Sequence, residues 1–480
     1  MSRRILVDPA PLRESREFRL LFFGQLVSTL GSQLTVVAIP FQVYAETHSS
    51  FQVGAISIAQ LIPLVVGSLI GGSVGDAVDR RLLLLVSSVA LTFASGGLAL
   101  NALAAHPSLL ALYLISAVAA GLAGFSNPAR NSVVPALVGP DNLVAALSFL
   151  QALFQLGAVV GPAAAGLLIG RAGIAWVYGI DAFTFFAAIV ATAMMRPIPP
   201  AAGADRPGLR SIVEGIGYLR GRPVMQGAYL IDINAMVFGM PRALFPAIGL
   251  AVFHGGPDIV GYLFAAPGLG ALIGALTTGW VARLDHRGRA VVVSVVVWGF
   301  AITGFGLSHL LWLALGLLAV AGWADVISAV LRNTILQTVV PEQFRSRIIA
   351  IQLAVVQGGP RVGDLESGGV AALAGTQFSV VSGGAICVAG AVALALAMPA
   401  FARHRASHLG PLGDPDLALP PRRAGSPRHD ERRRRRVAPL APSTTVGDRR
   451  EGVGSGSSID PTDPTETVDH GADLLRRAPG

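Results

Sequence analysis

The chain has no lysine, and it has a single cysteine, Cys387. All 36 of its basic residues are arginine. The absence of lysine excludes a lysine Schiff base and a phosphate loop of the Gly-x-x-x-x-Gly-Lys type. One cysteine excludes an intramolecular disulfide bond and a multi-cysteine metal site. The five histidines between 48 and 309 have neither a cysteine beside them nor a His-x-x-x-His partner. We therefore expect neither an enzyme nor a metal or cofactor protein.

Charge is also scarce. Charged residues make up 13% of the chain, against about 25% in soluble proteins. Hydrophobic residues make up 52%, and the mean hydropathy is +0.62. Most of the chain must therefore face lipid or the protein interior. An isoelectric point near 10.6 is typical of proteins that bind nucleic acid. Here, however, the arginines lie at the ends of apolar segments and in the C-terminal region. We expect contact with membrane lipid and none with nucleic acid.

Twelve apolar segments are long enough to be membrane spans, because a bilayer core of about 30 Å needs roughly 20 residues of helix. The polar residues 1–19 are not followed by an apolar stretch with a small-residue cleavage site, as they would be in a signal peptide, so the first segment is predicted to be a permanent span. The fold class is an all-α membrane protein with twelve transmembrane helices. The segments are 19–45, 52–75, 82–104, 108–129, 142–169, 173–195, 224–252, 258–282, 289–308, 310–331, 346–373 and 377–399.

The arginines fall in alternate loops, with Arg171 as the exception. By the positive-inside rule both termini are cytoplasmic. The expected domains are a cytoplasmic segment 1–18, a six-helix bundle 19–195, a proline-containing cytoplasmic linker 196–222, a second bundle 223–400 and a disordered tail 401–480. The run Arg432–Arg436 in the tail either binds anionic lipid headgroups or only marks the cytoplasmic side.

An internal repeat relates the two halves. Arg130-Asn131-Ser132 reappears 202 positions later as Arg332-Asn333-Thr334. The same offset aligns Gly161 with Gly363 and Gly166 with Gly368. Two similar apolar halves of about two hundred residues indicate a transporter with a pseudo-twofold axis along the membrane normal.

The loop after the second segment reads Gly72-Ser-Val-Gly-Asp76-Ala77-Val-Asp79-Arg80-Arg81. Together with twelve segments in two halves, it resembles the signature of the major facilitator superfamily. The glycine, the aspartate and the closing basic pair are present, whereas Ala77 replaces a basic residue and Asp79 a glycine. The resemblance covers about 1–400 and implies two pseudo-symmetric six-helix bundles with the substrate site between them.

A narrower resemblance lies in Asn127-Pro128-Ala129-Arg130 and Tyr178-x-x-Asp181-Ala182-x-Thr184-Phe185. These stretches are similar to the bacterial drug and siderophore exporters, the group that includes the enterobactin exporter and the macrolide efflux proteins. In the fifth segment, Gly157-x-x-x-Gly161-Pro162-x-x-x-Gly166 is similar to the antiporter motif of drug-efflux members. A Gly-x-x-x-Gly pattern also occurs wherever two membrane helices pack closely.

The signature predicts a gate at the cytoplasmic side. The superfamily resemblance implies that Asp76 faces the positive N-terminal end of the eleventh span. Arg130 is its candidate ion-pair partner. The alternative is a hydrophilic turn that serves only as a topology signal. The gate candidates are Gly72, Asp76, Asp79, Arg80, Arg81 and Arg130.

Ionisable residues inside the spans are the candidates for proton coupling, because each costs about 2.5–3.5 kcal/mol on insertion scales. A carboxylate in a low-dielectric site takes up a proton readily. Asp232 and Asp364 rank first. Alternatively, Asp364 only neutralises Arg361, and Glu366 lies near the aqueous rim. Asp181 and Asp232, near helix starts, are then caps or interfacial anchors. The full set is Asp181, Asp232, Asp325, Arg361, Asp364 and Glu366, with Arg242 also inside a span.

The polar residues of the first span, together with one in the seventh, are candidates for the substrate path. They are Gln25, Ser28, Gln33, Thr35 and Asn234. At helical spacing they are equally suited to hydrogen bonds between helices.

The sequence thus predicts a monomeric secondary transporter of the bacterial plasma (inner) membrane. It exports a hydrophobic or amphipathic small molecule, drug- or siderophore-like, in exchange for protons by alternating access. The alternatives are a siderophore-specific exporter, a proton-coupled importer, or a non-transporting membrane receptor or scaffold on the same fold.

Overall fold

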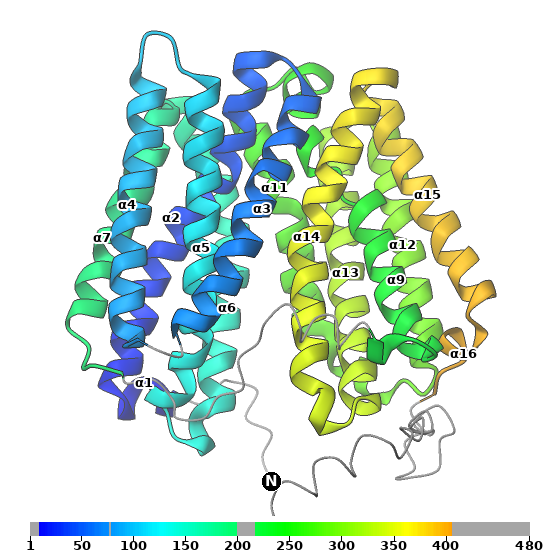
Figure 1. Cartoon of the computed structure of the whole chain (residues 1–480). Coiled ribbons are helices and arrows are strands. Elements are labelled where there is room, and N and C mark those ends of the chain that lie inside the picture. Colours follow the sequence, from blue (N-terminus) through cyan, green and yellow to red (C-terminus); the bar gives the residue numbers. More distant parts are fainter. Residues whose placement is uncertain (1–8, 76–77, 199–216, 406–480) are drawn as a thin grey trace, which may run out of the picture. The chain divides into compact units, whose positions relative to one another are not determined.

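The computed structural model describes residues 9–75, 78–198 and 217–405. The chain divides into two units, Met1–Ala418 and Leu419–Gly480. The second unit lies outside the described residues, as do Asp76 and the run Arg432–Arg436. All that follows concerns the first unit, whose described elements are helices (Figure 1).

The first half contains six long helices after the short α1 (Ala10–Glu14). Five of them begin and end within a few residues of the ends of the expected spans, while α5 continues well past residue 129, where the expected span ends. They are α2 (Arg16–Thr47), α3 (Ser50–Gly75), α4 (Arg80–Leu103), α5 (Leu109–Leu137), α6 (Pro140–Ala172) and α7 (Ile174–Ala193).

The second half repeats the pattern, with one broken span. After α9 (Pro223–Phe238) the chain continues through η1 (Arg242–Leu244), α10 (Phe245–Ala247) and η2 (Ile248–Val252). The remaining elements are α11 (Pro257–Thr277), η3 (Thr278–Arg283), α12 (Arg287–Leu307), α13 (Leu311–Val339), α14 (Glu342–Ala374), α15 (Thr376–Ala397) and α16 (Pro399–Ala402).

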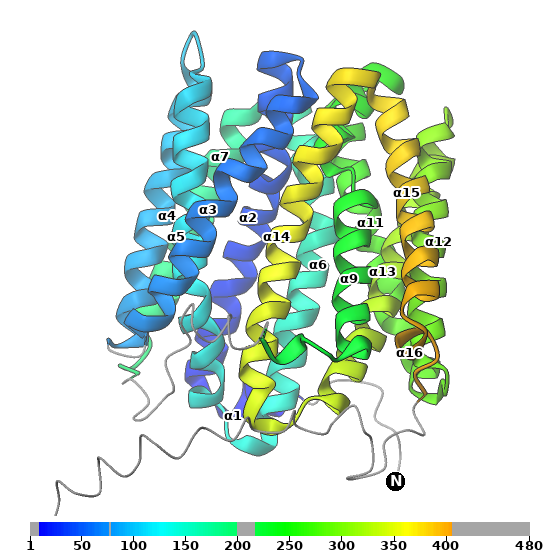
Figure 2. The ribbon, with the colours of Figure 1, turned by 45° about the vertical axis from the view of Figure 1, so that its right-hand side comes forward.

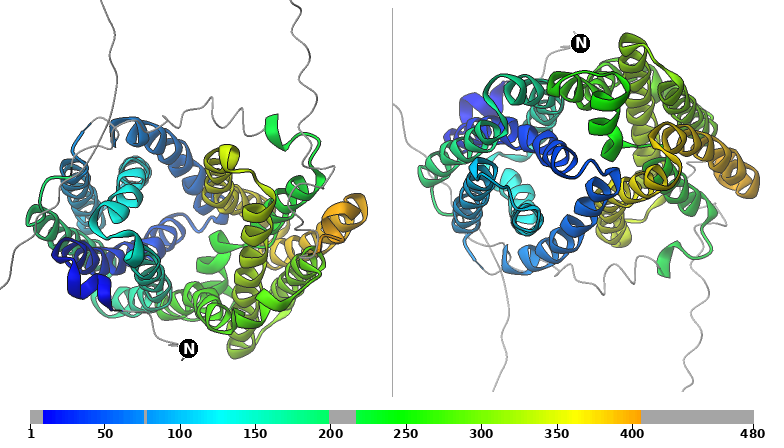
Figure 3. Two further views of the ribbon diagram at one scale, coloured as in Figure 1. Left: turned by 90° about the horizontal axis from the view of Figure 1, so that it is seen from below. Right: turned by 90° about the horizontal axis from the view of Figure 1, so that it is seen from above.

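Eleven of the described segments are long and apolar enough to cross a membrane. The twelfth helix, α14, has 33 residues but carries three charges in its second half, at Arg361, Asp364 and Glu366. The prediction of a twelve-helix membrane protein is confirmed. Seen along the helix axes, α2–α7 lie on one side and α9–α15 on the other (Figure 3). In the side view of Figure 2, α3, α4 and α5 lie toward one edge and α12, α13 and α15 toward the other.

The internal repeat appears as equivalent packing. Gly161 of α6 approaches Gln33 of α2, and its counterpart Gly363 of α14 approaches Met236 and Val237 of α9. The connections are equivalent too, since left-handed residues end the first span of each half, at His48 and His254. Gly173 and Gly375, 202 positions apart, both take positive φ before the last span of each half.

The most extensive contacts between the two halves are made by two equivalent helix pairs, α6 with α11 and α14 with α3. A Cβ on Gly166 would lie 2.5 Å from the carbonyl oxygen of Pro257, and one on Gly368 would lie 2.5 Å from that of Ser50. Small residues allow this approach, as is usual where membrane helices pack. Both contacts lie at the helix ends that face the arginine-poor loops.

The break in the seventh span leaves backbone groups that need partners. The indole N–H of Trp298, which is 2% exposed, donates to the carbonyl of Gly239 at 2.8 Å. On the other side of the break, the carboxylate of Asp364 in α14 accepts a hydrogen bond from the backbone N–H of Ala243. Irregular backbone inside a membrane protein is tolerated where protein groups satisfy it in this way.

The glycine contacts generate a stability prediction. We expect Gly368→Ala to destabilise the protein by about 1–3 kcal/mol, because the added methyl group overpacks the α14–α3 contact. The measurement is thermal unfolding in detergent. Gly369→Ala is the matched control, since nothing lies within 4 Å of a Cβ at that position. Equal melting temperatures for the two variants would contradict the packing argument.

Candidate functional site

A cavity of about 470 Å³ lies between the two halves. Its walls come from α2–α7 of the first half and from η1, α11 and α14 of the second. The volume falls within the range of about 300–1,000 Å³ that is usual for small-molecule sites. Apolar and hydroxyl side chains make up most of the lining. The ionisable residues in it are Arg130, Asp181, Arg242, Arg361 and Asp364.

Asp364 joins three helical elements from both halves. One of its carboxylate oxygens accepts a hydrogen bond from the Ser57 hydroxyl of α3 at 2.8 Å. The other accepts one from the backbone N–H of Ala243 in η1 at 3.1 Å. Asp364 therefore satisfies the donor that the helix break leaves open and links that break to the opposite half.

Arg361 lies one turn away from Asp364 on α14, within electrostatic reach of its carboxylate. Its guanidinium donates to the Gln357 carbonyl of its own helix at 2.8 Å. Among the described residues, no ion pair joins it to Asp364. Glu366 is half-buried on the same helix and is not part of the cavity lining.

Asp181 is the carboxylate of the first half. It is 2% exposed and lies two turns into α7, so it does not cap the start of the helix. One of its oxygens accepts hydrogen bonds from the hydroxyls of Thr35 at 2.8 Å and Ser95 at 2.7 Å. The other oxygen has no hydrogen-bond donor in the described part of the chain. Asp181 thereby links α2, α4 and α7 and has no cationic partner there.

Asp232 lies apart from the cavity lining. Its carboxylate is 2.7 Å from the guanidinium of Arg332, and the two side chains are 1% and 2% exposed. Asp325 lies two turns before Arg332 on α13, within electrostatic reach of the same pair. These three residues form a buried charge cluster inside the second half. Breaking such a pair is costly, because it leaves an unpaired charge in an apolar interior.

Side chains of the signature sequence Gly72–Arg81 form hydrogen bonds with the ends of helices in the first half. Asp79 caps α4, accepting from the backbone N–H groups of Arg81 at 2.8 Å and Ile198 at 3.1 Å. This role explains an acidic residue where the signature has glycine. Arg80 donates to the Ser132 carbonyl of α5 at 3.2 Å. Gly72 lies near the end of α3. The predicted pairing of Asp76 with Arg130 falls outside the described residues and stays a prediction.

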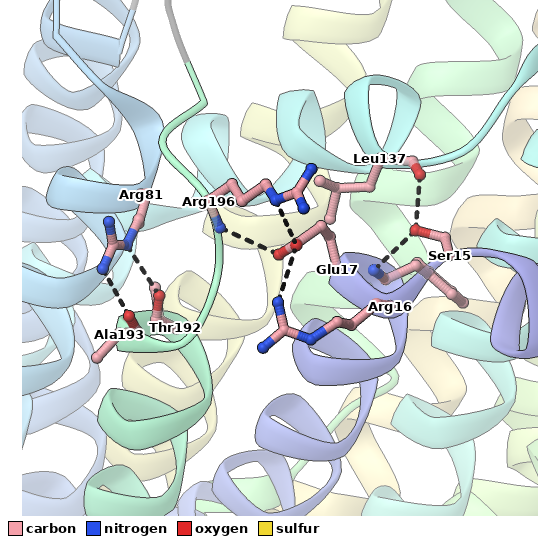
Figure 4. Close-up of polar contacts among 9 residues, drawn as sticks. Ser15, Arg16, Glu17, Arg81, Leu137, Thr192, Ala193 and Arg196 are labelled. Carbon is pink, nitrogen blue, oxygen red and sulfur yellow. Dashed lines mark hydrogen bonds and ion pairs between the residues drawn. The ribbon is translucent and has the colours of Figure 1, made fainter.

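Arg81 binds the C-terminal carbonyls of α7, those of Thr192 and Ala193 (Figure 4). Nearby, Glu17 forms ion pairs with Arg16 at 3.5 Å and Arg196 at 3.9 Å. A basic side chain at a helix C-terminus satisfies carbonyls that have no partner within the helix. The arginine-rich end of the first half is therefore tied together by charged side chains on backbone groups.

The candidate residues for the substrate path fall into those that line the cavity and those that do not. Ser28, Gln33 and Thr35 line the cavity, whereas Gln25 and Asn234 do not. The Asn234 amide instead donates to the carbonyl of Cys387 on α15 at 2.9 Å, the interhelical alternative. Sequence reasoning missed Ser57 and Ser95, each of which donates a hydrogen bond to one of the two cavity carboxylates. Their only signal was a hydroxyl in an apolar span.

Comparison with known proteins agrees with this geometry. The family model described as transmembrane secretion effector matches residues 8–423. The enterobactin exporter EntS of Citrobacter koseri is 31% identical over 392 residues, covering 82% of this chain and 94% of the relative. The EntS of Escherichia coli O1:K1 / APEC is 32% identical over 368 residues, covering 77% and 88%.

Among solved structures, a crystal structure of a variant of the nucleoside transporter NupG superposes with a TM-score of 0.65. It is 13% identical and covers 80% of this chain and 100% of its own. The likeness shows the fold. The sequence relatives and the family model show a multi-pass membrane transporter rather than an enzyme, and the resemblance to siderophore exporters is confirmed. The chain belongs to the transmembrane secretion effector family of the major facilitator superfamily.

Proposed function

We propose that this transporter exports a hydrophobic or amphipathic small molecule, drug- or siderophore-like, in exchange for protons by alternating access. The observation that carries the proposal is a cavity between the halves that is lined by one carboxylate from each half, Asp181 and Asp364. The enterobactin exporters among the relatives support the siderophore-like class.

The packing of the halves supports alternating access. The contacts of Gly166 and Gly368 bring the halves together at the arginine-poor ends. With both termini cytoplasmic in the inner membrane, as the positive-inside rule predicts, this end faces outward. The described conformation is then closed to the outside. Export requires these two contacts to separate.

Asp364 supplies a means of separating them. As a carboxylate it accepts from both Ser57 and Ala243, and hydrogen bonds to a charged group contribute about 1.5–3 kcal/mol. Protonation removes the charge and weakens both bonds. The change is comparable to the few kcal/mol that separate two conformations in equilibrium. Proton uptake at Asp364 therefore favours opening at the outer end.

Asp181 is the second proton site in this scheme. It lies within one half, so its charge does not bridge the two bundles directly. A molecule that fills the cavity cuts both carboxylates off from water, so protons exchange when the cavity is empty. Asp364 and Asp181 are better candidates than Asp232, because Arg332 already neutralises that carboxylate.

The proposal predicts that Asp364→Asn uncouples transport. The purified protein is reconstituted as a monomer in proteoliposomes with an imposed pH gradient. Enterobactin, a macrolide and ethidium are added in turn, and proton flux is followed with a pH-sensitive dye. We expect substrate-dependent proton flux to fall at least about tenfold in Asp364→Asn, because the asparagine side chain can neither take up nor release a proton at this position.

Glu366→Gln is the matched control, because it removes a carboxylate two positions away that does not line the cavity. Equal flux in wild type and Asp364→Asn would refute the role of Asp364. Flux in the opposite direction would favour an importer. A wild type that moves none of the probes and shows no proton flux would favour the receptor or scaffold alternative.

Asp181 is tested by a pair of substitutions. Asp181→Asn keeps an oxygen acceptor for the hydroxyls of Thr35 and Ser95 but cannot ionise. We expect a nearly unchanged melting temperature and reduced proton flux. Asp181→Leu leaves both hydroxyls without their acceptor, which costs about 1–3 kcal/mol, and its melting temperature should fall. If Asp181→Asn transports protons as wild type does, Asp181 is structural only.

A further inference from the structure

The internal repeat provides a comparison of two equivalent arginines. Arg130 of α5 and Arg332 of α13 occupy the same repeat position, 202 residues apart. Arg332 is buried, pairs with Asp232 at 2.7 Å and donates to the Ser328 hydroxyl at 2.9 Å. Arg130 lines the cavity, and no hydrogen bond or ion pair joins its side chain to another described residue.

At the positions equivalent to Asp232 and Asp325, the first half has no acidic residue. Two matches relate the first spans of the two halves. Gly161 packs on Gln33 as Gly363 packs on Met236, and His48 forms the same turn as His254. By these matches, the residues of the first half that are equivalent to Asp232 lie within 26–30. These residues are Leu-Val-Ser-Thr-Leu. The position of Asp325 corresponds to Ala123. The arginine at this repeat position thus forms a buried ion pair in the second half, whereas in the first half it lines the cavity.

Two more guanidinium groups line the cavity from the second half. Arg242 is exposed, and no hydrogen bond or ion pair joins its side chain to another described residue, although its charge acts on Asp364 from a distance. Arg361 is half-buried, and its Nε–H is buried without a hydrogen-bond acceptor in the described part of the chain. A buried donor without an acceptor is unfavourable unless a ligand supplies one.

The lining therefore carries three guanidinium groups against two carboxylates, and the carboxylates already accept hydrogen bonds from protein donors. Guanidinium groups bind oxyanions with paired, charge-assisted hydrogen bonds. Phe154, Phe185 and Phe264 add aromatic surface to the same cavity. This combination suits a molecule with an apolar or aromatic body and at least one oxyanion group.

We propose that the substrate is an amphipathic organic anion whose charged group binds Arg130 of one half and Arg242 and Arg361 of the other. The inference rests on the proposed export function and specifies its substrate class. Binding across the two halves makes the ligand part of their interface. Export of an anion from a cell with a negative interior is also favoured by the membrane potential.

The test uses two dyes with the same xanthene core and opposite charge, carboxyfluorescein and rhodamine 6G. Binding to the full-length protein in nanodiscs is measured by fluorescence polarisation. We expect carboxyfluorescein to bind at least about tenfold more tightly than rhodamine 6G, and Arg130→Gln to weaken that binding about tenfold. Arg361→Gln should weaken carboxyfluorescein binding by a similar factor, and it replaces Arg130→Gln as the test if that variant does not fold.

Arg171→Gln is the matched control, because it removes an exposed arginine of α6 outside the cavity lining. Equal or tighter binding of rhodamine 6G overturns the inference. So does carboxyfluorescein binding that neither cavity variant weakens, or no binding of the anionic dye. Failure of the export proposal is a separate result, because it is the absence of substrate-linked proton flux in proteoliposomes whatever dye binds.

Discussion

The carboxylate of Asp364 makes the interaction on which the arrangement of the two halves depends most. Its two oxygens receive a hydroxyl from α3 and a backbone N–H from η1, so one side chain holds the broken seventh span and the opposite bundle at once. An aspartate inside a membrane protein is costly, by about 2.5–3.5 kcal/mol on insertion scales. Here both oxygens have donors, and that explains how the charge is accommodated.

In the proposed mechanism, the same interaction makes closure of the outer end depend on the protonation state of Asp364. Glycine packing at Gly166 and Gly368 supplies shape complementarity that does not change with pH. The bonds of Asp364 depend on its charge. In the proposed mechanism, proton uptake at Asp364 weakens this charge-dependent contact and so alters the balance between two conformations without disturbing the interior of either bundle.

Pseudo-symmetry explains much of the architecture, and its exceptions mark the site. The interface helices, the left-handed turns and the glycine contacts recur in both halves. The charges do not. Arg332 is neutralised by Asp232 inside the second half, whereas Arg130 faces the cavity. The repeated framework therefore positions the bundles, while unrepeated side chains give the cavity its charge.

The sequence was enough to predict the helices, because apolar length and the repeat are local properties of the chain. It also identified Asp181, Asp364 and Arg361 as ionisable residues within spans. It did not separate them from Asp232, since that distinction depends on Arg332, a partner from another helix. Ser57 and Ser95 were not singled out because a lone serine in an apolar helix usually bonds to its own backbone.

The most direct test of the coupling role of Asp364 is a distance measurement across the outer end. Leu103 and Leu373 are 71% and 91% exposed, at the ends of α4 and α14, and the native Cys387 is buried. Spin labels at Leu103→Cys and Leu373→Cys report their separation by pulsed electron resonance. The account predicts a longer-distance population on acidification in the wild-type background and no pH response in Asp364→Asn. A wild-type distribution that ignores pH, or an Asp364→Asn variant that responds as wild type does, would contradict it.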